Sequence, residues 1–177
     1  YTVRAYYKDG NKTIWGDFNQ TGVTKKPVTS APKLVSVTSS TATNVTVKWE
    51  TVSGANGYKV MRKADGSKTW STIGTTNSKK LSYTDKKVSC GVKYHYTVRA
   101  YRNVSKKPVL GSYNSNGLEI MTIPDRPVVS VSSANYNKLN VSWSRSNGAT
   151  GYKVYRKVVN GTYKLIRNIS GGAATGF

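Results

Sequence analysis

Hydrophobic and polar residues alternate with a period of two in many short runs along the chain. In residues 44–50, for example, Val45, Val47 and Trp49 are separated by single polar residues. Alternation of this kind places one set of side chains on each face of a β-strand. Gly, Asn, Asp and Ser residues, which favour turns, separate the runs. The pattern predicts an all-β protein.

Seven such runs follow one another at intervals near ten residues in the middle of the chain. The strands predicted from them cover residues 34–37, 44–50, 58–63, 70–75, 80–84, 93–101 and 118–122. Short strands at this spacing are typical of two antiparallel sheets packed face to face. We therefore expect a β-sandwich here, with a turn at residues 54–57 and a loop between the last two strands.

The same sequence pattern occurs more than once. Residues 53–63 and 147–157 share a Gly-Tyr-Lys-Val strand behind a glycine-containing turn, 94 residues apart. The first six residues, Tyr-Thr-Val-Arg-Ala-Tyr, recur at residues 96–101, 95 residues further on. A period of this length indicates repeated domains, because solenoid repeats have about 20–50 residues.

The repeat divides the chain into three units. Residues 1–26 correspond to the last two strands of a unit, and residues 27–123 form a complete unit with its preceding linker. Residues 124–177 correspond to the first strands of a third unit, up to the start of its fifth strand. In this alignment Phe177 falls on Tyr83 and Tyr1 falls on Tyr96.

Several residues of the central unit form a pattern known from one domain family. They are Trp49, Tyr58 with Val60, Val88 followed six residues later by Tyr94, and then Tyr96, Val98 and Ala100. With these residues the unit resembles a fibronectin type III domain of the kind found along bacterial surface proteins. The resemblance implies immunoglobulin-like β-sandwiches in tandem, with about seven strands per unit. It also implies that the Tyr94 hydroxyl ties down the turn before its strand.

The partial units at the two ends allow two interpretations. One is a fragment boundary within a longer array. The other is complementation between copies, in which the strands of residues 1–26 complete residues 124–177 of the next copy. Exposed sheet edges and apolar faces are rarely tolerated in proteins. A head-to-tail contact of this kind propagates into fibres.

The charge balance is strongly basic. Twenty-eight Lys and Arg residues stand against seven Asp and Glu residues, which gives a net charge of +21. Such a charge attracts nucleic acid, anionic lipid or acidic polysaccharide without selecting among them. It also suits a secreted protein that simply lies beside an anionic surface. No apolar run approaches the roughly 20 residues of a membrane span, so none is expected in this segment.

The predicted strands 58–63 and 93–101 are neighbours in this fold, and their outward residues should form one basic, partly aromatic patch. The candidate residues for binding a polyanion or another ligand are Lys59, Lys63, Arg99, Tyr101, Arg102, Lys106, Lys107, Lys153, Tyr155 and Lys157. Cationic groups suit phosphate or carboxylate, and aromatic rings stack on bases or sugars. The same residues also suit a solvated sheet face that keeps an array soluble.

Catalytic chemistry is not indicated. The acidic residues are scattered, and no two form an obvious pair for acid–base work. Asp85 should make a local hydrogen bond in its turn. His95, the only histidine, should lie on the surface, and a zinc site needs several nitrogen or sulfur ligands. Cys90 is the only cysteine, so an intrachain disulfide is excluded, and the thiol is either unreactive or pairs between chains.

The sequence predicts a non-catalytic structural spacer, secreted or attached to a bacterial cell wall, without a cofactor. Anionic cell-wall or extracellular glycopolymer would hold it near the surface, and copies could assemble head to tail. Two alternatives stay open. One is a specific adhesin or ligand-binding module that uses the patch. The other is an accessory domain of a polysaccharide-degrading enzyme. Specific nucleic-acid binding is not expected.

Overall fold

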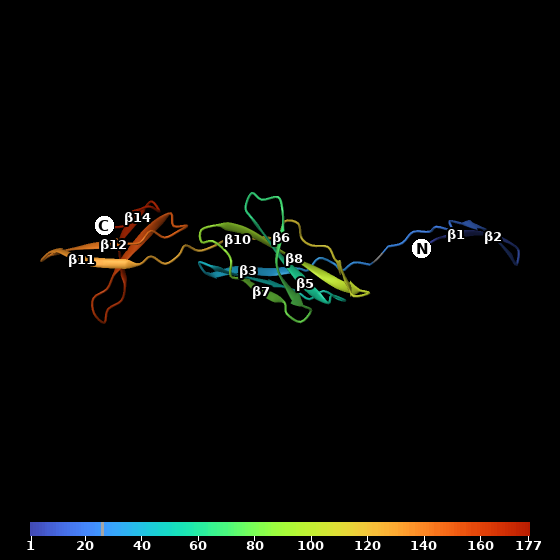
Figure 1. The fold of residues 1–177 in the computed structure, drawn as a ribbon, viewed down its shortest axis with the longest axis horizontal. Coiled ribbons are helices and arrows are strands. Elements are labelled where there is room, and N and C mark those ends of the chain that lie inside the picture. Colours follow the sequence, from blue (N-terminus) through green and yellow to red (C-terminus); the bar gives the residue numbers. More distant parts are fainter. Residues whose placement is uncertain (26) are drawn as a thin grey trace.

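The computed structural model describes residues 1–25 and 27–177, and its regular structure consists of β-strands. Figure 1 shows three groups of strands along an elongated molecule. We call them the N-terminal hairpin (β1 and β2), the middle group (β3 to β10) and the C-terminal group (β11 to β14). Within the described residues, no helix is long and apolar enough to cross a membrane.

The middle group is a two-sheet sandwich, as predicted. Its strands are β3 (Leu34–Thr41), β4 (Asn44–Trp49), β5 (Gly57–Ala64), β6 (Ser71–Asn77), β7 (Ser82–Asp85), β8 (Lys93–Val104), β9 (Lys107–Leu110) and β10 (Leu118–Met121). One sheet has the order β3-β4-β7. The other has the order β10-β8-β5-β6, with β9 also paired to β8, and the strand pairs are antiparallel.

The core of the middle group lies between these sheets. Val45, Val47 and Trp49 of β4 are buried there. Tyr58 and Val60 of β5, with Tyr96, Val98 and Ala100 of β8, face them from the other sheet. The predicted inward positions of these strands are therefore confirmed, because period-two alternation gives each strand one apolar face.

The segment predicted as a loop before the last strand is different. β8 runs three residues beyond its predicted end, and β9 returns along it after a turn at Ser105 and Lys106. Residues 111–117 then leave the sheet before β10 pairs with the start of β8. The middle group thus has eight strands, because β9 forms within the segment predicted as a loop, while the expected last strand is present as β10.

The prediction that Gly57 belongs to the turn at residues 54–57 is wrong, since Gly57 is the first residue of β5. A side chain here would collide with the Tyr101 ring on β8 and with the carbonyl of Thr76. Gly57 is therefore needed for close packing within the sheet. The turn itself contains Gly54, whose φ of 72° lies in the region that favours glycine.

Tyrosine hydroxyls hold the turns between strands. The hydroxyl of Tyr94 accepts a hydrogen bond from the backbone N–H of Ser89 at 3.2 Å, as the resemblance implied. Tyr58 accepts in the same way from Val52 at 3.0 Å. In the C-terminal group, Tyr152 accepts from Ser146 at 3.0 Å. The link between β4 and β5 therefore recurs in the second copy of the repeat.

The C-terminal group consists of two antiparallel strand pairs. β11 (Val129–Asn135) pairs with β12 (Lys138–Trp143), and β13 (Gly151–Arg156) pairs with β14 (Lys164–Ser170). Phe177 exchanges backbone hydrogen bonds of 2.9 and 3.2 Å with Val141. It lies beside β12 where Tyr83 lies beside Val47 in the middle group.

The N-terminal hairpin pairs β1 (Arg4–Asp9) with β2 (Lys12–Phe18), and nearly all of its side chains are exposed. Arg4 Nε donates to the carbonyl of Gly16 at 2.5 Å. The Arg4 guanidinium lies 5.5 Å from the Trp15 ring and 5.7 Å from the Phe18 ring. These contacts order a hairpin that has no sheet packed against it in the described part of the chain.

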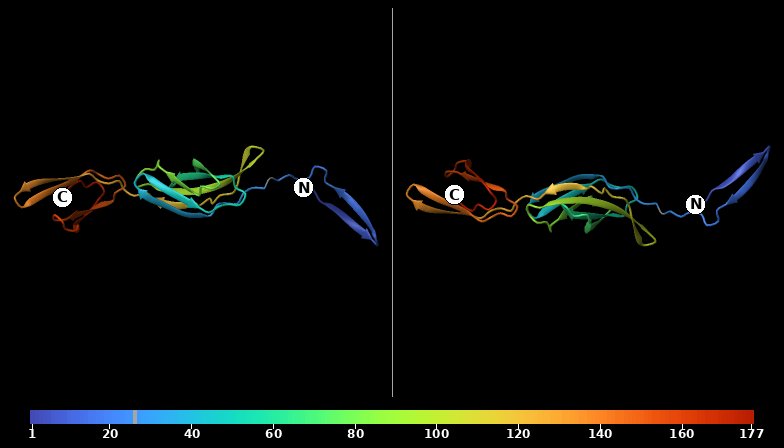
Figure 2. Two further views of the ribbon diagram at one scale, coloured as in Figure 1. Left: turned by 90° about the horizontal axis from the view of Figure 1, so that it is seen from below. Right: turned by 90° about the horizontal axis from the view of Figure 1, so that it is seen from above.

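The middle and C-terminal groups follow each other along the long axis and meet at a short junction (Figure 2). The α-carbons of Gly91 and Gly148 approach so closely there that a side chain on either would collide with the other. Asp125 in the linker accepts a hydrogen bond from Asn147 at 3.2 Å. The thiol of Cys90, partly buried at the same junction, lies 3.9 Å from the Asp125 carboxylate.

Candidate functional site

The predicted basic patch begins on the outer face of β5 and β8. Lys59 lies opposite Arg99, and Lys63 lies opposite His95. Both pairs face away from the core, because Val60 and Val98, which alternate with them along the two strands, point inward. The structure therefore brings together three of the candidate cations, Lys59, Lys63 and Arg99, on one sheet face.

This face is largely covered at its centre. Thr97, in the middle of the patch, is 0% exposed, and its hydroxyl donates to the carbonyl of Asn114 at 2.7 Å. Arg99 Nε donates to the carbonyl of Gly111 at 2.5 Å, and its guanidinium lies 5.3 Å from the Tyr113 ring. Residues 111–117 thus fold over the face, and Arg99 holds that segment in place.

Other members of the patch also have partners. The ammonium group of Lys63 lies 5.1 Å from the ring of Trp70. His95 Nε2 lies 2.8 Å from the Asp65 carboxylate, and this hydrogen bond holds the pKa of Asp65 below its ordinary value of 3.8. Lys59 is half-buried in the sheet. The outer face is therefore a network of internal contacts more than an open binding surface.

The remaining middle-group candidates lie on the β8–β9 hairpin. Tyr101 packs over Gly57 at its base. Arg102, Lys106 and Lys107 are exposed, and within the described chain none of them forms an ion pair. The hairpin projects beyond the sandwich, as Figure 2 shows. We call these three residues the basic tip.

The turn of this hairpin has an unusual backbone. Ser105 and Lys106 have φ values of 50° and 64°. Positive φ at both central residues of a two-residue turn is typical of type I′ and favours Asn and Gly. A serine and a lysine are therefore strained here, and the lysine stands at the outermost point of the tip.

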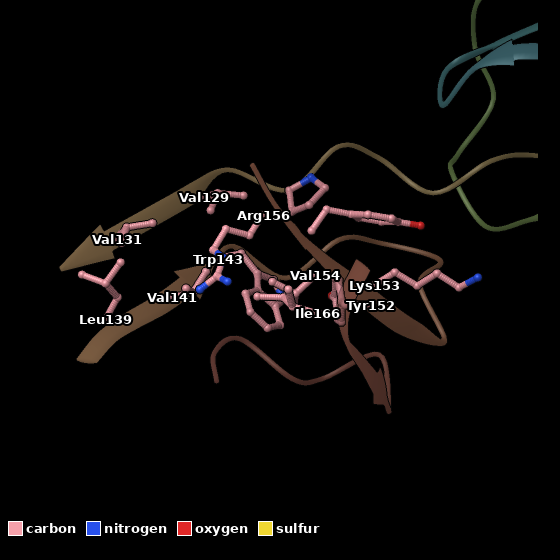
Figure 3. A pocket seen from close by; sticks show the side chains of 12 residues that line it. Val129, Val131, Leu139, Val141, Trp143, Tyr152, Lys153, Val154, Arg156 and Ile166 are labelled. Atoms are coloured by element: carbon pink, nitrogen blue, oxygen red, sulfur yellow. The ribbon is translucent and has the colours of Figure 1, made fainter. Parts of the chain in front are cut away.

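The candidates of the C-terminal group lie on another part of the molecule. Lys153 and Tyr155 are exposed on β13, and Lys157 places its ammonium group 5.1 Å from the Tyr163 ring. Lys153, Tyr155 and their neighbours on β13 border an apolar groove of about 360 Å³ (Figure 3). The candidate residues thus divide among a covered face, an exposed tip and the rim of a groove.

Sequence reasoning missed a buried polar cluster between the sheets. Asp85 accepts hydrogen bonds from Arg62 at 2.7 Å and from the Tyr96 hydroxyl at 3.0 Å. It also accepts one from the Lys87 N–H at 2.9 Å, which is the predicted local turn bond. Burial, together with the nearby Asp85 carboxylate, raises the pKa of Tyr96 well above its ordinary value of 10.0. The only signal in the sequence was an arginine at an inward strand position.

No group of three His, Cys, Asp or Glu residues that could hold a metal ion occurs in the described part of the chain. Asp85, which supplies the carboxylate of the cluster, is neutralised by Arg62, and the side chains of Asp85 and Arg62 are 4% and 23% exposed. This cluster is therefore arranged as a structural ion pair, with its hydrogen bonds satisfied.

Comparison with known proteins gives partial matches. No protein-family model matches the chain. A stretch of 129 residues is 30% identical to Exoglucanase B of Cellulomonas fimi and covers 66% of this chain and 11% of that protein. A stretch of 53 residues is 40% identical to Amylopullulanase of Thermoanaerobacterium saccharolyticum and covers 29% of this chain and 4% of that protein. The chain therefore spans a small part of these curated relatives.

Among solved structures, a segment of two fibronectin type III domains from chicken tenascin is similar to this chain. The TM-score is 0.50 at 19% sequence identity, and the match covers 82% of this chain and 80% of that one. The sheet orders β3-β4-β7 and β10-β8-β5-β6 agree with a two-sheet sandwich of this kind. The chain has the fold of tandem fibronectin type III domains.

Proposed function

We propose that this chain is a non-catalytic accessory and spacing segment of an extracellular bacterial protein. The observation that carries the proposal is the small share of the two relatives that it matches, 11% and 4%. Their names denote enzymes that act on glucans, and a stretch this short in a long enzyme is suited to spacing other domains. The extended arrangement of the three strand groups suits the same task (Figure 1).

A hydrolysis assay tests the non-catalytic part of the proposal. The 177-residue chain is incubated with cellulose, amylose and pullulan, and the released reducing sugar is measured. We expect no release above that of a heat-unfolded sample. Sugar release that follows the folded protein through purification would overturn the proposal.

We further propose that the basic tip holds anionic extracellular polymer near the protein. The net charge of +21 attracts polyanions from a distance, and the tip presents on a projecting hairpin three cations that form no ion pair with the described residues. Lys63 and Arg99 are less suited, because aromatic rings and a backbone carbonyl already occupy them. The closed centre of the β5–β8 face gives less support to a specific adhesin that binds there.

Binding to polygalacturonate, with neutral dextran as a control, tests this role. We expect binding to the acidic polymer that weakens steeply as salt rises, because the attraction is screened. Charge reversal of Arg102, Lys106 and Lys107 to Glu should weaken it more than the same reversal of the exposed residues Lys48, Lys79 and Lys86. Equal losses from both triple variants would exclude a special role for the tip.

The proposed role includes assembly of copies end to end. The N-terminal hairpin and the C-terminal group lie at opposite ends of the molecule (Figure 1). Both expose large apolar side chains, among them Trp15 on β2 and Leu139 on β12. Apolar surface at the two ends of an elongated molecule favours contacts between copies along its axis.

A further inference from the structure

A pocket of about 450 Å³ lies at one side of the middle group, with residues of β6 and β7 in its walls. β6 and β7 are the last strands of their two sheets, so the pocket lies where the sandwich is open along an edge. All of its lining residues lie between residues 62 and 87. Pockets that hold small molecules have volumes of roughly 300–1,000 Å³. This pocket is therefore a candidate binding site, and it is separate from the basic tip.

The guanidinium group of Arg62 lines the pocket and is held in a fixed position. Its Nη1 donates to the Asp85 carboxylate and to the carbonyl of Lys87, both at 2.7 Å. Its central carbon lies 4.9 Å from the centre of the Tyr94 ring. A cation that is already ordered in this way loses little conformational freedom when it binds a further group.

Arg62 keeps donors for such a group. An arginine side chain has five N–H donors, and both hydrogen bonds of Arg62 use Nη1. Within the described chain, Nε and Nη2 donate no hydrogen bond, and the side chain is 23% exposed. Two neighbouring guanidinium nitrogens match the two oxygens of a carboxylate, which they bind through parallel hydrogen bonds. The ion pair thus satisfies Asp85 without using all of the donors of Arg62.

Two further cations, Lys86 and Lys87, line the pocket. Both are exposed, and neither forms an ion pair with the described residues. The backbone of Lys87 is fixed, because its N–H donates to Asp85 at 2.9 Å and its carbonyl accepts from Arg62. Among the lining residues, three cations stand against the one carboxylate of Asp85. This excess of positive charge favours an anionic ligand.

The walls of the pocket are suited to a sugar ring. Ile73 and the ring of Tyr83 supply apolar surface, and the Tyr83 hydroxyl donates to the carbonyl of Ile73 at 2.7 Å. The ring packs on Gly74, where a side chain would collide with it. Thr72 and Thr84 also line the pocket and carry hydroxyl groups. Fixed apolar surface beside a few polar groups is the usual lining of a small-molecule site.

We propose that this pocket binds one carboxylate-bearing sugar residue, as in a uronate of an acidic glycan. The carboxylate is bound by Arg62 and the two lysines, and the apolar face of the sugar ring lies against Tyr83. This inference goes beyond the proposed function, because the pocket distinguishes an acidic sugar from a neutral one. It does not rest on the role of the basic tip. A sulfated sugar is also anionic, but its tetrahedral group fits the planar guanidinium less well.

An NMR titration of the ¹⁵N-labelled 177-residue chain tests the ligand class. The ligands are the methyl glycosides of galacturonate, galactose and galactose 6-sulfate, in about 0.15 M salt so that long-range attraction is screened. We expect saturable shifts of the Thr72, Thr84 and Lys87 amide signals with the galacturonate ligand. The sulfated ligand should bind about tenfold more weakly, and the galactose ligand should give no saturable shift. Equal binding of all three ligands, or no binding of the galacturonate ligand, would overturn the inference.

Substitution of the pocket lysines tests the charge requirement. Lys86→Gln with Lys87→Gln should raise the dissociation constant of the galacturonate ligand about tenfold. The backbone bonds of Lys87 remain, so Arg62 and Asp85 stay in place. Lys79→Gln with Lys80→Gln removes the same charge at exposed positions outside the pocket and should leave binding unchanged. Equal losses in both double variants would exclude a special role for the pocket lysines.

Filling the pocket tests its location. Thr72→Phe places a ring in the pocket from an exposed position on the edge strand β6 and should abolish binding. Thr75→Phe makes the same change at an exposed position of β6 that does not line the pocket, and it should bind as the parent does. Thermal unfolding shows that both variants are folded. Undiminished binding by Thr72→Phe would overturn the inference.

The single sugar residue also separates this pocket from the basic tip. Charge reversal of the tip should leave binding of the galacturonate ligand unchanged. Reversal of Lys48, Lys79 and Lys86 should weaken it, because Lys86 lines the pocket. For polygalacturonate we expect the opposite order. Loss of the small ligand in the tip variant would overturn the pocket, whereas an unchanged affinity of that variant for the polymer would overturn the role of the tip alone.

Discussion

The middle and C-terminal groups carry corresponding residues on corresponding strands, yet their side chains differ in burial. Val45 is 0% exposed, whereas its counterpart Leu139 is 63% exposed. The strand pairs β3–β4 and β11–β12 share most of their antiparallel register, and they differ by a register shift between Leu34 and Ser36 that β11–β12 lacks. The local pattern therefore specifies strands and hairpins, while burial depends on β8 and β10, which come from distant positions in the sequence.

One contact persists in both groups. The rings of Trp49 and Tyr58 lie 5.5 Å apart, and those of Trp143 and Tyr152 lie 5.3 Å apart. Both tryptophans are buried. An aromatic pair of this kind contributes about 0.5–1.5 kcal/mol beyond the area it buries. In the C-terminal group it connects β12 with β13, although no strand of the described part of the chain covers the remaining core face.

The largest expected difference comes from a carboxylate on the core face of the second strand. Val45→Asp should destabilise the middle group by about 4 kcal/mol or more, because the charge has no partner in the core. Leu139→Asp should change the stability of the C-terminal group by less than about 0.5 kcal/mol. Hydrogen exchange of peptides from each group, measured in dilute solution, distinguishes the two. Similar losses would show that the groove is closed in the free chain.

Arginine at the end of the third strand provides the next comparison. Arg62→Ala leaves the buried Asp85 carboxylate without its ion-pair partner and should cost about 3 kcal/mol. Arg156→Ala should cost little, because Arg156 is exposed at the equivalent position. Urea unfolding of the two variants measures both effects. If Asp85→Asn does not recover part of the loss in Arg62→Ala, the ion pair is not its cause.

The stability of the middle and C-terminal groups should also differ in its dependence on alkaline pH. The folded middle group raises the pKa of Tyr96 above the 10.0 of a free phenol, so the folded state resists loss of this proton. The contribution is complete below about pH 10 and falls by roughly 1.4 kcal/mol per unit as pH rises above it. In Tyr96→Phe this dependence should disappear, which unfolding measurements between about pH 9 and pH 12 can check. An unchanged slope of unfolding free energy against pH would show that other titratable side chains cause the dependence.

The smallest expected loss of stability should occur in both the middle group and the C-terminal group. Tyr58→Phe and Tyr152→Phe each remove the acceptor for a backbone N–H in the turn after the second strand, and Tyr152→Phe also removes the donor to the carbonyl of Gly172. Each should cost about 1 kcal/mol in its own group. Thermal unfolding monitored by hydrogen exchange can resolve them. A loss confined to Tyr58→Phe would mean that the turn bond depends on the closed core.

Alternation predicted the sandwich and the inward residues, but it did not predict β9. Two features hid this strand. Pro108 lies inside it, and proline normally argues against a strand. Ser105 and Lys106 form its turn without the Asn or Gly that such a turn favours. Pairing with the end of β8 imposes a conformation that the local sequence does not indicate.

The sequence predicted which sheet face carries the candidate side chains, but not whether these side chains are accessible. Strand parity correctly placed Lys59, Lys63 and Arg99 on the outer face. Their availability depends on residues 111–117, which fold over Thr97 through contacts from far along the chain. The Arg62–Asp85–Tyr96 cluster was missed for the same reason, since its members come from three different strands.

The meeting of Gly91 and Gly148 has a consequence for the shape of the chain as a whole. Backbone lies directly against backbone there, so the two groups approach each other more closely than a side chain at either position would allow. A single methyl group at either glycine would act as a wedge and tilt one sandwich against the other. Across the length of a sandwich, that small tilt becomes a large displacement of the far end. The absence of these two side chains, together with the contacts of Asp125 with Asn147 and Cys90, thus fixes the direction in which the chain extends.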